Sequence, residues 1–171
     1  PNVVRLGEAG DVTAELFLPS DSDPSVDSVL TAVESTYEIL GEAFGLPEGA
    51  TYLVIALTPL RGGGGWHFRS NHLIAGGARP GSIDRGGPFP RAWLGHEVAH
   101  GWTRPTGPAT NFLSEGWANY AESLLIAARY GTTAEADYWE SQRTYYERND
   151  FDGNARLSYD PNNSGVSYYK G

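Results

Sequence analysis

The chain has 171 residues, of which 40% are hydrophobic, and carries a formal net charge of −9. This acidic excess argues against nucleic acid and anionic membranes as partners, because both are bound through basic patches. The absence of cysteine excludes disulfides and thiolate metal ligands. There is no run of about eighteen apolar residues, so we expect no membrane insertion. The length predicts one domain with a sizeable core, while compartment and oligomeric state stay open.

The N-terminal part of the chain predicts a small sheet with one helix inserted. Apolar and β-branched runs at 3–6 and 12–18 predict two strands around a turn. Apolar residues then recur at spacings of three and four over 24–44, which predicts an amphipathic helix. The continuous apolar run 52–58 is typical of a buried strand.

The remaining elements are mainly helical. A glycine-rich turn at 61–65 lacks the lysine and the serine or threonine of a phosphate-binding loop, and 69–75 predicts a returning strand. A helix is predicted over 112–130, ended by Gly131, and a further helix over 132–148. We expect the aromatic residues of this last helix to pack mainly in the core.

The segment His96-Glu97-Val98-Ala99-His100 carries the strongest chemical signal. Residues four apart lie on one face of a helix, so His96 and His100 can present imidazole nitrogens to one metal ion. Glu97 follows the first histidine, where its carboxylate can take a proton from a metal-bound water. The pattern therefore predicts a catalytic zinc site with Glu97 as general base.

A catalytic zinc site usually has a third protein ligand. Glu115 is the candidate, because it lies in the first turn of the next predicted helix and a short loop separates that helix from His100. We therefore predict one Zn²⁺ ion bound by His96, His100 and Glu115.

This pattern resembles the gluzincin metallopeptidases, in the branch of aminopeptidase N, leukotriene hydrolase and glycyl aminopeptidase. Glu115 stands in an S-E-G-W-A context, and Tyr120 and Glu122 match the Y-x-E that follows the third ligand. Tyr168 opens a segment similar to the family's Y-x-K-G. The resemblance implies that Tyr168 stabilises the oxyanion of the tetrahedral intermediate. It also implies an α+β, thermolysin-like catalytic domain that acts on a peptide or protein substrate.

Two departures from the family pattern bear on specificity. The loop between His100 and Glu115 is shorter than is usual in the family. Aminopeptidases of this branch also carry a glutamate that binds the substrate's amino terminus, in a segment whose nearest counterpart here is 64–68. His67 stands at that position, and a histidine is a poor anion for holding an ammonium group. Exopeptidase and endopeptidase activity therefore both stay open.

We predict that Gly64, Gly65, Trp66 and His67 contact substrate, with 66–75 forming an edge strand beside the metal. Such a strand would pair with an extended peptide, and the glycines would allow close approach. An ordinary exposed hairpin is the alternative. Asn119, one turn beyond Glu115, is a candidate to orient a ligand histidine through its outer ring N–H, and Glu122, two turns along, to hold the charges of the site in place. Both could equally be solvated helix positions.

The sequence thus predicts a zinc metallopeptidase domain spanning 1–171, excised from a longer chain. A zinc-stabilised peptide-binding module without catalysis is the alternative from another class. Glu97 argues against that alternative, because a purely structural site has no use for a general base. A non-peptide hydrolase, such as an epoxide-opening relative, is a further alternative.

Overall fold

The computed structural model describes residues 3–18, 26–47, 49–58, 64–68, 72–76, 88–103 and 110–148. Tyr168, predicted to stabilise an oxyanion, lies outside these residues, as does the expected start of the first helix. Side chains at 61–93 are likewise outside the description, so β4 and β5 below are placed by their backbone alone.

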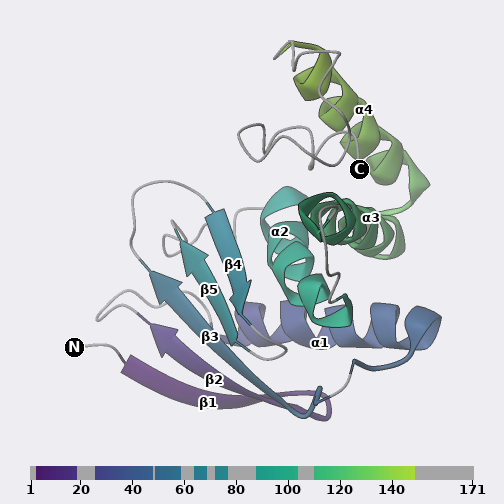
Figure 1. The fold of residues 1–171 in the computed structure, drawn as a ribbon. Helices are drawn as coiled ribbons and strands as arrows, with labels where there is room; N and C mark the ends of the chain where they lie inside the picture. The colour runs from purple at the N-terminus through teal and green to yellow at the C-terminus, as the bar shows by residue number, and fades with distance from the viewer. Residues whose placement is uncertain are drawn as a thin grey trace.

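A mixed sheet forms one side of the molecule (Figure 1). Its strands are β1 (Val3–Ala9), β2 (Val12–Leu18), β3 (Tyr52–Thr58), β4 (Gly64–Phe68) and β5 (His72–Gly76), in the order β1-β2-β3-β5-β4. The outer pairs β1–β2 and β4–β5 are antiparallel, whereas β3 runs parallel to both β2 and β5. Parallel pairing of β2 and β3 requires a crossover, which α1 (Val26–Phe44) supplies.

The helices gather beside the sheet (Figure 1). They are α2 (Pro88–Ala99), the 3₁₀ turn η1 (His100–Trp102), α3 (Thr110–Tyr130) and α4 (Thr132–Arg148). Helix α1 packs against β1, α2 and α3, while α2 also contacts β4 and β5, and α4 packs against α3. The prediction of a small sheet followed by helices is confirmed.

The main core lies between the sheet and α1. Ala14 and Leu16 of β2 are buried beside Leu53 and Ile55 of β3, with which they are paired in register. Alternation along each strand turns these residues to one face. The predicted stripe on α1 closes this core with residues spaced by four, namely Val29, Val33 and Tyr37. Leu40, three residues further on, joins a second cluster with α3.

Several predicted boundaries differ from the structure. The first strand continues to Ala9 rather than ending at residue 6, so the turn before β2 is shorter than predicted and contains Gly10 at φ 60°. The predicted edge strand 66–75 is wrong as one element: β4 forms the edge, and β5 lies inside the sheet between β3 and β4. Within the described part of the chain, none of the helices combines the length and the apolar character needed to cross a membrane.

Candidate metal centre

Helix α2 is held tightly against its neighbours where it carries the first histidine. Leu94, Val98 and Ala99 are buried, as the apolar sequence of this helix predicts. Gly95 permits the close approach, because a Cβ there would lie 2.3 Å from Cδ1 of Leu125 on α3. His96 follows directly and is itself buried. The packing of α2 therefore fixes the backbone position of His96.

His100 lies one turn later, in η1 rather than in α2, which ends at Ala99. The sequence predicted both histidines on one uninterrupted helix, and the change to 3₁₀ geometry at His100 is a small correction. The two imidazole rings still face the same region, with centroids 5.1 Å apart and planes at 84°. A tightened last turn is common where a helix ends.

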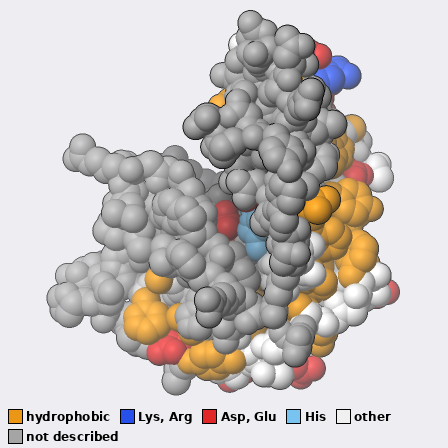
Figure 2. Space-filling view, viewed as in Figure 1, with side chains coloured by type: hydrophobic (Ala, Val, Ile, Leu, Met, Phe, Trp, Pro, Cys, Tyr) orange, Lys and Arg blue, Asp and Glu red, His pale blue; other side chains and the backbone are white. Residues whose placement is uncertain are grey.

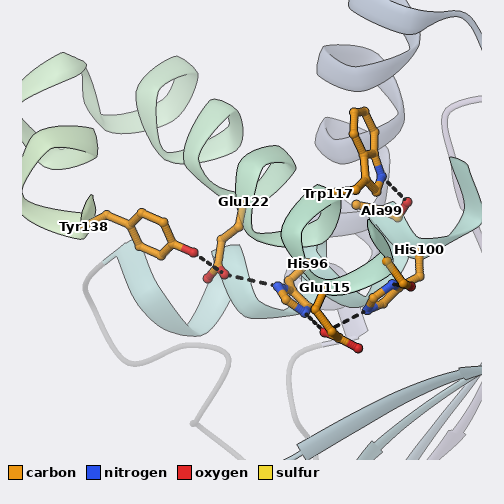
Figure 3. A network of polar contacts seen from close by, with 8 residues as sticks. His96, Ala99, His100, Glu115, Trp117, Glu122 and Tyr138 are labelled. Atoms are coloured by element: carbon orange, nitrogen blue, oxygen red, sulfur yellow. Dashed lines mark hydrogen bonds and ion pairs between the residues drawn. The ribbon is translucent and has the colours of Figure 1, made fainter. Parts of the chain in front are cut away.

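Glu115 reaches this pair from α3 (Figure 3). Its Oε2 lies 3.4 Å from Nε2 of His96 and 3.7 Å from Nε2 of His100. Potential ligand atoms of these three residues all lie within 4.8 Å of one another. Two imidazole nitrogens and a carboxylate oxygen are the donor types that zinc accepts in catalytic sites. The residues predicted as metal ligands are thus brought together, and their chemistry fits zinc.

The outer nitrogen of each histidine also has a partner. Nδ1 of His96 lies 3.4 Å from Oε2 of Glu122, and that oxygen accepts a hydrogen bond of 3.1 Å from the Tyr138 hydroxyl (Figure 3). Nδ1 of His100 lies 3.0 Å from Oγ of Ser114. Contacts of this kind fix ring orientation and tautomer in metal sites. Both imidazoles therefore direct Nε2 towards Glu115.

Glu97 is buried beside the cluster. Burial raises the pKa of its carboxyl group to about 7, and the negative charges of Glu115 and Glu122 act in the same direction, whereas His96 lowers it. A carboxyl group with a pKa near neutrality can both accept and return a proton at physiological pH.

The charges around His96 favour a cation at this place. Burial alone lowers the pKa of His96, but hydrogen bonds with Glu115 and Glu122 and the negative charges of Glu122 and Glu97 raise it to about 10. The same carboxylates would attract a divalent cation. Figure 2 shows histidine and acidic side chains together near the middle of the displayed face.

A hydrogen bond joins α2 and α3, the helices on either side of the centre, directly. The indole Nε1 of Trp117 donates to the carbonyl oxygen of Ala99 at 2.9 Å (Figure 3). Ala99 ends α2 and precedes His100, while Trp117 lies two residues after Glu115. This bond therefore couples the backbone that carries His100 to the helix that carries Glu115.

The other predicted site residues divide into two groups. Asn119 is buried on the same helix as Glu115, and its role in orienting a histidine stays a prediction. Gly64, Gly65, Trp66 and His67 lie on β4, the sheet edge beside α2, and substrate contact likewise stays a prediction.

Sequence reasoning missed Ser114 and Tyr138. Ser114 directly precedes Glu115, and that adjacency is a signal that it could approach the centre. Tyr138 carried no such signal, because an aromatic residue spaced as on one face of a helix is normally interpreted as a core residue. Of the aromatic residues expected to pack from α4, Tyr138 is buried, whereas Trp139 and Tyr145 are exposed.

Comparison with known proteins identifies the fold. No protein-family model and no curated protein matches the sequence. Among solved structures, yeast LTA4 hydrolase matches with a TM-score of 0.75 and 18% identity over 98% of this chain and 28% of the other. The M1 zinc metallopeptidase from Deinococcus radiodurans matches with a TM-score of 0.62 and 17% identity, over 99% of this chain and 38% of the other.

Aminopeptidase A from Legionella pneumophila is a third similar structure, with a TM-score of 0.60 and 14% identity over 77% of this chain and 17% of the other. This chain thus spans well under half the length of each of these proteins. At such identities the likeness concerns backbone architecture. The chain therefore has the fold of a portion of M1-type zinc peptidase and LTA4 hydrolase structures.

Proposed function

We propose that this chain carries the catalytic centre of a zinc-dependent peptidase with a thermolysin-like arrangement. The observation that supports it most is the convergence of His96, His100 and Glu115, with Glu97 buried next to them. The likeness to zinc metallopeptidase structures supports the same reaction class. That Glu97 is retained favours catalysis over a binding module that uses zinc only for stability.

His96, His100 and Glu115 would hold the ion, and bound zinc supplies a Lewis acid that polarises the scissile carbonyl and acidifies water. Glu97 would take a proton from the attacking water on its carboxylate. It would then deliver that proton to the amide nitrogen, so that the C–N bond breaks and the amine leaves neutral. Tyr168 would donate a hydrogen bond to the developing oxyanion.

Substrate binding is proposed at β4. This strand is an edge of the sheet and lies next to α2, so its backbone is placed where an extended peptide could add a strand near the metal centre. His67, the fourth residue of β4, is paired in register with Leu73 of β5. We propose internal cleavage of peptides, because a histidine at this position offers no fixed anion for an amino terminus.

Mass-spectrometric mapping of peptide cleavage tests this function. The zinc-loaded chain is incubated with one peptide whose amino terminus is free and with the same peptide acetylated, and Glu97→Gln serves as control. Internal cuts in both peptides that are absent with Glu97→Gln support the proposal. Removal of single residues from the free peptide alone would mean an aminopeptidase. If zinc binds but neither peptide is cut, the binding-module alternative is favoured.

A further inference from the structure

A chain of polar contacts leads from α4 into the metal centre (Figure 3). The Tyr138 hydroxyl donates to Oε2 of Glu122 at 3.1 Å, and the same oxygen lies 3.4 Å from Nδ1 of His96. On its other side, Nε2 of His96 lies 3.4 Å from Oε2 of Glu115. The contacts therefore cross three helices, from α4 through α3 to α2.

Tyr138 is itself firmly placed. It is 1% exposed and packs with Ile126 of α3 and with Ala134 of its own helix. Among the residues of α4, all of which are described, Tyr138 is the one that is buried. The sparse burial of the rest of α4 means that Tyr138 is the main anchor of this helix on α3.

A glutamate side chain has three rotatable bonds, and its terminal carboxylate torsion is broad. With His96 as its only partner, the Glu122 side chain could still rotate, and fixing it against the histidine would cost conformational entropy. A second contact from a rigid, buried phenol restricts that rotation and stabilises the negative charge. Glu122 then faces Nδ1 of His96 in a single orientation.

We propose that Tyr138 is a positioning residue of the metal centre, acting through Glu122 to orient the imidazole of His96. Helix α4 is by this account a functional part of the centre. The inference rests on the proposed metal-binding function, but not on peptide cleavage. The competing explanation is that Tyr138 is a core residue whose hydroxyl merely finds a partner.

The test compares three variants of the whole chain. Tyr138→Phe removes the hydroxyl and keeps the ring. Tyr37→Phe removes the hydroxyl of another buried tyrosine, which takes no part in this chain of contacts. Ile126→Val trims the apolar partner of Tyr138 and so loosens the packing of α4 without touching the polar contacts. Far-UV circular dichroism establishes that each variant is folded.

Two measurements are made with the metal ion alone. Competition with a chromophoric chelator gives the Kd for Zn²⁺, and the visible absorption of the Co²⁺-loaded protein reports the ligand geometry. We expect Tyr138→Phe to weaken zinc binding about 10-fold, typical for loss of a residue that supports a metal ligand, and to change the Co²⁺ spectrum. Tyr37→Phe and Ile126→Val should leave the Kd and the spectrum unchanged.

A double-mutant cycle with Glu122→Gln identifies the route. If Tyr138 acts through Glu122, adding Tyr138→Phe to Glu122→Gln causes no further loss of zinc affinity. Additive losses would overturn the proposal, as would an unchanged Kd in Tyr138→Phe or an equal loss in Ile126→Val. A Tyr138→Phe chain that does not fold, while Tyr37→Phe does, would assign Tyr138 a structural role and also overturn it.

Failure of the proposed peptidase function is distinguishable from failure of this inference. A chain that binds zinc but cuts no peptide still reports the effect of Tyr138 on the Kd. Conversely, the chain could cut peptides while neither Tyr138→Phe nor Glu122→Gln changes the Kd for Zn²⁺. That result would refute the positioning role and leave the peptidase function supported.

Discussion

The indole nitrogen of Trp117 donates a hydrogen bond of 2.9 Å to the carbonyl oxygen of Ala99. Ala99 is fully buried, so loss of the indole donor would leave its carbonyl oxygen without this partner in a dry environment. We expect Trp117→Phe to lower the free energy of unfolding by about 1 to 3 kcal/mol, measured by urea denaturation of the metal-free protein. Trp139→Phe, at an exposed indole, should change it by less than about 0.5 kcal/mol. Equal effects of the two variants would show that the bond contributes nothing specific.

Two helical glycines predict opposite results for the same substitution. In Gly95→Ala the new Cβ would lie 2.3 Å from Cδ1 of Leu125, a side chain that is fully buried and has no room to move. We expect this variant to lose about 1 to 3 kcal/mol of unfolding free energy through overpacking. In Gly41→Ala the nearest atom is Cδ2 of Leu46, which is exposed and can turn away.

Gly41→Ala should therefore be neutral, or more stable by up to about 1 kcal/mol, because alanine favours helix. Thermal unfolding of both variants measures the contrast. If Gly95→Ala is as stable as Gly41→Ala, then α2 and α3 are not packed closely at this point.

Zinc should stabilise the folded chain, because the unfolded chain does not hold His96, His100 and Glu115 together. At a free zinc concentration 100-fold above the Kd, the free energy of unfolding should rise by about 2.7 kcal/mol. Magnesium should have little effect, since it prefers oxygen ligands in octahedral geometry. Chelation should reverse the effect, and His100→Ala should abolish it. A rise that persists in His100→Ala would place the ion elsewhere.

Ser114→Ala tests the support of the second histidine. Oγ of Ser114 lies 3.0 Å from Nδ1 of His100, and its loss should weaken zinc binding about 10-fold. Ser123→Ala is the matched control on the same helix, because the Ser123 hydroxyl donates to the backbone oxygen of Tyr120. Chelator competition measures both, and an unchanged Kd in Ser114→Ala would show that His100 needs no support from this hydroxyl.

The raised pKa of Tyr37 leads us to expect that the free energy of unfolding falls at alkaline pH. Burial raises its pKa to about 12 from 10.0. Stability from this tyrosine is fully present below pH 10 and is lost as the pH rises towards 12, because the unfolded chain ionises first. Near pH 11 the loss is about 1 kcal/mol. Tyr37→Phe lacks this ionisable hydroxyl. Its free energy of unfolding should therefore fall less steeply between pH 10 and 12 than that of the unaltered chain. Parallel pH curves would contradict this prediction.

The sequence predicted most elements because their signals are local. Spacings of three and four located the buried face of α1, and the continuous apolar run at 52–58 identified β3 as a buried strand. The order of strands was not predictable, because pairing of β3 with β5 depends on distant segments and leaves no local pattern. The metal-centre candidates likewise follow from one helical spacing and one downstream glutamate.

The outer contacts of the metal centre escaped prediction for the same reason. Glu122 was a candidate because it shares a helix with Glu115. Tyr138 meets Glu122 across the α3–α4 contact, which depends on how those helices pack rather than on any spacing along either of them. A residue that supports a ligand from a third helix is visible in three dimensions alone.

Every described residue of the centre, from His96 to Tyr138, lies on consecutive helical segments, whereas the parallel pairing of β2 with β3 joins more distant parts of the chain, such as Thr13 and Tyr52. Contacts between near neighbours in sequence close small loops and form early, while parallel strand pairing is slow. The helical segment could therefore assemble its side chains before the sheet is complete. When the whole chain refolds, zinc bound at this helical segment would then act as a template for the late steps of folding.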